Sequence, residues 1–278
     1  MKRSDTRVAV LLIEGTNSED ESVAFFRHLG AQAEKVHLKQ LTGDAPAEMR
    51  RTLDSYDVLM IPGGFAAGDY VRAGAIFAAR LRSRLAGDLT AFVEAGKPVF
   101  GACNGFQVLV EAGLLPALGG TMTETPEAVL ATNDSGHYEC RPSLLRLDNA
   151  GSCVFTQTLR RKEVVTFISA HAEGKLLFPK ERSAKILKTL AENDQIVFRF
   201  VDDQGRKGRY PWNPSGTTDG IAALCNRDGN VFGVQPHPER CFFRHLRPDW
   251  TRASGRDEMY GDGMPIFESV LQYVEKRF

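Results

Sequence analysis

The sequence has few cysteines, no net charge and no long hydrophobic run. Its 278 residues include five cysteines, and none of them forms a C-x-x-C pair. Such an odd, scattered set argues against both a zinc site and a disulfide framework. The 35 basic residues balance the 35 acidic ones, so the charge gives no sign of a nucleic-acid or anionic-membrane surface. These features predict a reduced, cytoplasmic protein with neither nucleic-acid nor membrane partners.

Two kinds of signal are also missing from the chain. Neither the G-x-G-x-x-G fingerprint nor the G-x-x-x-x-G-K-[ST] phosphate loop occurs, so no nucleotide-binding motif is present. No apolar run approaches the roughly 20 residues that cross a bilayer. Residues 1–5 lead directly into a strand-like apolar run and contain no cleavage site, which is not the pattern of a signal peptide.

The stretch from Pro98 to Gln107 joins a short apolar run, a tight turn and an amphipathic run. This pattern predicts a strand, a sharp turn and a helix, with Cys103 at the centre of the turn. Gly101 and Gly105 flank it with the spacing of the G-x-S-x-G elbow in serine hydrolases. The N–H groups at the start of the helix would favour the reactive thiolate. A free cysteine is more often a small buried apolar residue, but this turn favours a catalytic nucleophile.

Strand-like and helix-like patterns alternate in the first half of the chain. We expect strands at 7–13, 36–38, 56–61 and 98–102, and the longest helix at about 73–95. This alternation predicts the α/β class with right-handed βαβ units and a mostly parallel sheet. Cys103 and the Gly63–Gly64 pair each follow a strand, so they should meet at the carboxyl edge of the sheet, where active sites lie.

Short β-like segments dominate the second half. They lie at 143–147, 163–170, 196–201, 221–225 and 231–235, with hairpin turns expected at 202–205 and 226–230. A polar stretch and a closing helix at 265–278 make up the C-terminal part, 241–278. Without a repeat or a linker, the chain is predicted to form a single domain, 1–278.

His237 and Glu239 are the candidates for the base and its orienting group. We expect Pro238 to hold the chain extended, so that imidazole and carboxylate meet edge to edge. The backbone N–H groups of the glycine loop at 62–65 and of Asn104 are candidate oxyanion-hole donors. His171 also follows a strand and is either a second site residue or a core histidine. The other cysteines are expected to be inert, and Arg80, Arg82 and Arg84 to decorate a solvated helix face.

Residues 101–107 and 236–240 together resemble the class I (triad-type) glutamine amidotransferases. Residues 62–74, 170–175, 212–216 and 229–233 are similar to the glutaminase of phosphoribosylformylglycinamidine synthase, as is the asparagine after the nucleophile, Asn104. Ala67 and Ala172 depart from this pattern, which usually has tyrosine and glycine there.

The resemblance implies a flavodoxin-like, doubly wound sheet with added β-hairpins and a glutaminase that works through a cysteinyl thioester. Cys103, His237 and Glu239 would form the catalytic triad, and Gly64 and Asn104 would supply the oxyanion-hole amides. Three further residues would line the glutamine pocket: Phe65, Gln107 and His171. No metal site is implied.

The resemblance also implies a partner for the ammonia that is released. A large synthetase subunit, with a third small subunit, would use ATP and magnesium to make formylglycinamidine ribonucleotide from formylglycinamide ribonucleotide in purine biosynthesis. This chain itself would need no cofactor. The alternatives are a glutaminase of another synthetase, a stand-alone cysteine hydrolase or peptidase, and a non-catalytic gating module. The presence of both Cys103 and His237 argues against the last.

Overall fold

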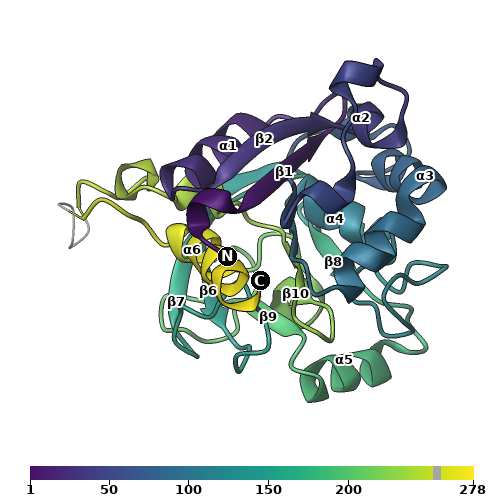
Figure 1. The fold of residues 1–278 in the computed structure, drawn as a ribbon. Coiled ribbons are helices and arrows are strands. Elements are labelled where there is room, and N and C mark those ends of the chain that lie inside the picture. Colours follow the sequence, from purple (N-terminus) through teal and green to yellow (C-terminus); the bar gives the residue numbers. More distant parts are fainter. Residues whose placement is uncertain (253–257) are drawn as a thin grey trace.

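The structure is a computed structural model that describes residues 1–252 and 258–278. The strands of its main sheet are β1 (Arg7–Leu12), β2 (Gln32–His37), β3 (Val58–Ile61), β4 (Val99–Ala102), β6 (Glu139–Leu147), β7 (Val164–His171), β9 (Ile196–Phe200), β10 (Ile221–Cys225) and β11 (Val231–Val234). Their order across the sheet is β2-β1-β3-β4-β11-β10-β9-β6-β7. Figure 1 labels strands from both ends of this order, β2 and β1 at one end and β9, β6 and β7 at the other. A separate two-stranded sheet pairs β5 (Val129–Ala131) with β8 (Lys175–Leu177).

The sheet has a parallel half and an antiparallel half. Strands β2, β1, β3, β4 and β11 run parallel to their neighbours, and β1, β3 and β4 are almost wholly buried because helices cover both faces. From β10 onwards the pairing is antiparallel. The expected hairpin turn at 226–230 joins β10 to β11. The α/β class and the added hairpins are therefore confirmed.

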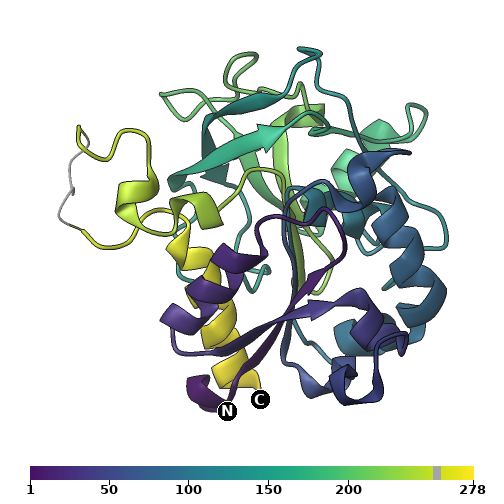
Figure 2. The same ribbon diagram turned by 90° about the horizontal axis from the view of Figure 1, so that it is seen from above.

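Helices lie on both faces of the sheet. Those of the structure are α1 (Glu19–His28), α2 (Leu38–Thr42), α3 (Ala75–Glu94), α4 (Asn104–Glu111), α5 (Ser183–Glu192) and α6 (Met264–Arg277). Figure 2 shows α1 and α6 side by side on one face and α3 on the other. Among the described residues, no helix has the length and apolar character needed to cross a membrane.

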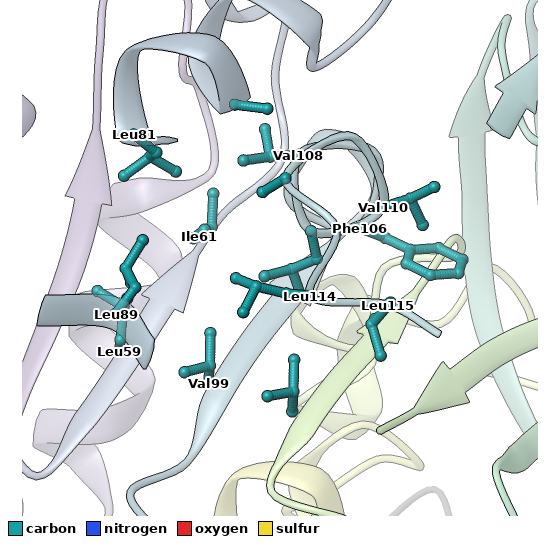
Figure 3. Packing of buried hydrophobic residues seen from close by; sticks show 14 of the residues in the cluster. Leu59, Ile61, Leu81, Leu89, Val99, Phe106, Val108, Val110, Leu114 and Leu115 are labelled. Atoms are coloured by element: carbon teal, nitrogen blue, oxygen red, sulfur yellow. The ribbon is translucent and has the colours of Figure 1, made fainter. Parts of the chain in front are cut away.

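Each face of the sheet has its own hydrophobic core. On one face Phe26 and Phe267 pack against sheet residues such as Phe100. On the other, Leu89 and Phe106 belong to a cluster between the central strands and helices α3 and α4 (Figure 3). Full burial of one such side chain contributes about 1.5–3 kcal/mol. The two cores hold the central strands, and so the turn that follows β4, in a fixed position.

The structure differs from the expectations at several places, and β6 begins at Glu139 rather than at residue 143. The second strand begins at Gln32 rather than at residue 36, because it is an edge strand whose exposed positions interrupt the apolar pattern. Helix α5 was not expected, and its buried residues are only Ile186 and Leu190. Arg82 does not simply decorate a solvated face, since its guanidinium donates hydrogen bonds to three backbone carbonyls between residues 112 and 124.

Candidate active site

Cys103 occupies a sharp turn between β4 and α4. Its φ of 50° is positive, which is unusual for a residue other than glycine and indicates local strain. A Cβ atom at Gly101 would lie 2.6 Å from the carbonyl oxygen of Gly105, and one at Gly105 would lie 1.8 Å from that of Ile61. Only glycine allows the helix to approach the strands this closely. The predicted strand, turn and helix are therefore confirmed, together with the reason for the two glycines.

The thiol of Cys103 is held inside the protein rather than on its surface. The side chain is buried, and its Sγ lies 3.6 Å from the carbonyl oxygen of Ala170 at the end of β7. The backbone N–H of Cys103 donates to the carbonyl of Val234, at the end of β11. The nucleophile thus lies where the parallel and antiparallel halves of the sheet meet.

His237 and Glu239 form a hydrogen-bonded pair beside this thiol. Nδ1 of His237 bonds to Oε1 of Glu239, and both side chains are fully buried. Burial alone would lower the pKa of His237, but the negative charges of Glu239 and Cys103 outweigh it and raise this pKa to about 10. The same ion pair lowers the pKa of Glu239 against the effect of its own burial. At neutral pH the arrangement favours a protonated imidazole beside the Glu239 carboxylate.

The backbone around Pro238 differs from the expected extended form. Pro238 has φ −69° and ψ −31°, and it leads into a short 3₁₀ helix, Glu239–Cys241. This turn brings the Glu239 carboxylate to the His237 ring. The prediction was wrong because the φ that a proline ring imposes fits a helical turn as well as an extended chain. His237 itself is extended against β7, since its N–H donates to the carbonyl of Ile168.

The two expected oxyanion-hole donors are both available. In residues 1–252 and 258–278, no group accepts a hydrogen bond from the backbone N–H of Gly64 or of Asn104. Gly64 has φ 144°, and a Cβ atom there would lie 2.6 Å from the carbonyl oxygen of Gly15. The loop after β3 therefore needs glycine at this position. Gly64 and Cys103 line the same pocket.

That pocket has a cavity volume of about 60 Å³ and lies at the carboxyl edge of the parallel strands. It brings together Cys103, His237 and the three residues expected to line it: Phe65, Gln107 and His171. Phe65 is half exposed at the rim, 6.5 Å from the ring of Tyr138. Gln107 is buried, and its Nε2 donates to the carbonyl of Glu173 at 2.6 Å.

Comparison with known proteins agrees with this geometry. Residues 5–274 match the family model of the CobB/CobQ-like glutamine amidotransferase domain. The chain belongs to this family. The prediction of a glutamine amidotransferase is confirmed.

The relatives of this amidotransferase share a name. A protein of Archaeoglobus fulgidus, named phosphoribosylformylglycinamidine synthase subunit PurQ, is 50% identical over 279 residues, which cover 99% of this chain and all of the relative. The protein of the same name from Picrophilus torridus is 42% identical over 85% of this chain and 88% of its own. A chain from the solved structure of PurLQS from Thermotoga maritima matches with a TM-score of 0.70 and 27% identity, covering 97% of this chain and 99% of that one.

The amidotransferase pocket also contains charged residues that the sequence analysis did not assign to the site. Asp69, Glu173 and Arg240 line it, as does Tyr138. Burial and the nearby charge of Glu173 raise the pKa of Asp69 to about 6. Asp69, Glu173 and Arg240 lie within the recognised segments 62–74, 170–175 and 236–240, so their positions gave a signal. No pattern in the sequence around Tyr138 indicated that this residue lines the pocket.

In the part of the chain that is described, no group of three or more His, Cys, Asp or Glu side chains could hold a metal ion. Three of the remaining cysteines are buried: Cys153, Cys225 and Cys241. Cys140 is exposed on β6. The pocket therefore contains one thiol, that of Cys103.

Proposed function

We propose that this chain is the glutaminase subunit of a phosphoribosylformylglycinamidine synthase and hydrolyses L-glutamine to glutamate and ammonia. The observation that carries the proposal is that Cys103, His237 and Gly64 line one pocket. Glu239 bonds to His237, and the unpaired N–H of Asn104 directly follows the nucleophile. The similarity over the whole chain to proteins named as this subunit supports the assignment of the synthase.

In the first half of the reaction, the Cys103 thiolate attacks the carboxamide carbon of glutamine and forms a C–S bond. The carbonyl oxygen gains negative charge, which the N–H groups of Gly64 and Asn104 can stabilise. Protonated His237 then gives its proton to the nitrogen as the C–N bond breaks. Ammonia leaves, and a glutamyl thioester remains on Cys103.

In the second half, neutral His237 removes a proton from water, and the resulting hydroxide attacks the thioester. The C–S bond breaks, which returns the thiolate and the protonated imidazole to their starting state. Glu239 holds the ring in the correct orientation and stabilises its positive charge during both halves. One glutamine and one water thus give one glutamate and one ammonia.

The ammonia would pass to a large synthetase subunit, and a third small subunit would complete the assembly. The synthetase would use ATP and magnesium to convert formylglycinamide ribonucleotide to formylglycinamidine ribonucleotide. Two observations support this division: the sequence contains no phosphate-binding loop, and the Thermotoga maritima relative belongs to a structure named PurLQS. This chain needs no cofactor for its own half of the chemistry.

Trapping with a diazo ketone analogue of glutamine, followed by mass spectrometry, tests the proposal. We expect one label, on Cys103, and protection of that residue by excess glutamine. The exposed Cys140 is the internal control, because iodoacetamide should modify it whether or not glutamine is present. Labelling of Cys140 by the analogue while Cys103 stays free would contradict the mechanism.

A further inference from the structure

The side chain of Asn133 is fixed by the backbone groups around it. Its Nδ2 lies 3.0 Å from the carbonyl oxygen of His137 and 2.8 Å from that of His171, so this end is the NH₂ group. Its Oδ1 accepts from the N–H of Gly174 at 2.9 Å. Because both ends have a backbone partner of defined character, a flipped amide would lose all three hydrogen bonds.

This orientation determines which nitrogen of His171 carries the proton. Nδ1 of His171 lies 3.2 Å from Oδ1 of Asn133, which is an acceptor. Nδ1 must therefore be the N–H donor, and the other ring nitrogen, Nε2, keeps its lone pair. Burial and the nearby His237 lower the pKa of His171 to about 3, so the ring stays neutral at physiological pH.

Nε2 of His171 faces no protein partner. The side chain is only 2% exposed, and within the described ranges Nε2 is buried without a hydrogen bond. Native proteins rarely bury an unpaired polar atom without a functional reason. The ring also has little freedom to turn away, since it packs so closely over Gly174 that a Cβ atom there would lie 2.3 Å from Cε1. His171 thus brings a fixed hydrogen-bond acceptor to the pocket of Cys103.

We propose that Nε2 of His171 accepts a hydrogen bond from the carboxamide NH₂ of glutamine and so selects glutamine over glutamate. This inference rests on the proposed function. A carboxamide offers two N–H donors, whereas a carboxylate offers only acceptors and carries a negative charge. An acceptor that cannot become a donor therefore holds the substrate amide, leaves its oxygen for the amides of Gly64 and Asn104, and repels the carboxylate product.

The first test compares two substrates that differ only in the leaving group, glutamine and the γ-methyl ester of glutamate, which has no N–H at that position. For His171→Phe we expect kcat/KM to fall about 10- to 100-fold with glutamine and to stay near the wild-type value with the ester. His171→Gln should restore part of the loss, because its amide oxygen can accept. His245→Phe is the matched control, since His245 is exposed and lies outside the pocket.

Equal losses with both substrates would overturn the inference, because His171 would then serve the α-amino group or the fold. Unchanged kinetics with glutamine would overturn it as well. If the wild-type chain released no ammonia from glutamine, the proposed function itself would have failed.

A second measurement leaves His171 intact and uses the Cys103→Ala variant, which can bind glutamine without turnover. In a sample with ¹⁵N-labelled histidine, we expect saturating glutamine to shift the Nε2 resonance of His171 and glutamate to leave it in place. Calorimetry confirms that glutamine is bound. A shift with both ligands, or with neither, contradicts the assignment to the carboxamide, and an absence of glutamine binding contradicts the proposed function.

Discussion

Two histidines in the pocket come from opposite halves of the sheet. His237 follows β11 in the parallel half, and His171 ends β7 at the antiparallel edge. Both rings are buried, yet Nδ1 of His237 bonds to a carboxylate, Glu239, whereas Nδ1 of His171 bonds to an amide, Asn133. The pKa is raised to about 10 for the first ring and lowered to about 3 for the second.

The comparison shows how one residue type serves two purposes a short distance apart. Burial lowers the pKa of both rings, because it penalises the charged form. Only His237 has negative charges beside it, from Glu239 and Cys103, and these reverse the effect of burial. One ring can therefore exchange protons with the reacting groups, while the other keeps a fixed lone pair.

The most direct way to remove the difference between the two histidines is the Glu239→Gln substitution. It gives His237 an amide partner like that of His171. The variant loses the charge that stabilises the imidazolium, and its amide can hold the ring in the wrong tautomer. We expect kcat for glutamine to fall by about 10³- to 10⁴-fold, as loss of the orienting carboxylate does in other triads. Steady-state release of ammonia measures the effect.

The matched control is Glu48→Gln on the exposed surface, which should leave kcat unchanged. We also expect binding to the synthetase subunit to survive in Glu239→Gln, because the carboxylate is buried. A variant that kept kcat within tenfold of wild type would show that the Glu239 charge is not needed.

Each ring also packs against a glycine, which allows the two regions to be disturbed separately. A Cβ atom at Gly63 would lie 2.6 Å from Cε1 of His237, and one at Gly174 would lie 2.3 Å from Cε1 of His171. Gly63→Ala should slow hydrolysis of glutamine and of the γ-methyl ester alike, by about 10²-fold, because a small displacement of a catalytic group is costly. Gly174→Ala should reduce kcat/KM for glutamine more than for the ester.

Gly87 provides the control for these two variants. It lies within α3, and a Cβ atom there would meet nothing within 4 Å. Gly87→Ala should therefore leave both rates unchanged and raise the free energy of unfolding by about 0.5–1 kcal/mol. Loss of activity in Gly87→Ala would mean that the assay responds to general damage rather than to the rings.

The sequence revealed one of the two regions much better than the other. The elbow around Cys103 and the His237–Glu239 pair could be predicted because glycine spacing and a two-residue separation are local patterns. The partner of His171 could not, since Asn133 lies 38 residues away and its surroundings carry no motif. The burial that makes His171 neutral also depends on the whole antiparallel half. Whether this histidine belonged to the site or to the core could only be decided in three dimensions.

The strands and helices, too, could be predicted only in part from the sequence. Strands with continuous apolar runs, such as β1 and β10, could be located to within a residue. The alternating edge strand β2 and the sparsely apolar helix α5 could not, because tertiary packing rather than local pattern determines their extent. The conformation of Pro238 was missed for a related reason. Its φ is compatible with both an extended and a helical backbone, and only the contact between Glu239 and His237 selects the helical one.

The smallest expected effect is on the pH dependence of the free energy of unfolding. The contributions of the two histidines to it should change with pH in opposite directions. His171 has a folded-state pKa of about 3, below the ordinary value of 6.5, so the unfolded chain binds its proton first. Its contribution to stability is therefore lost as the pH falls from 6.5 towards 3. The raised pKa of His237 stabilises the fold below pH 6.5, and this contribution is lost as the pH rises towards 10.

Either histidine can change the free energy of unfolding by at most about 1.4 kcal/mol per pH unit. Denaturant titrations of wild type and His171→Gln between pH 4 and 9 measure the difference. We expect the variant to have a shallower decline on the acid side and the same slope on the alkaline side, whereas Glu239→Gln should flatten the alkaline side. An acid slope in His171→Gln as steep as in wild type would mean that His171 is not held neutral, and the contrast between the two rings would fail.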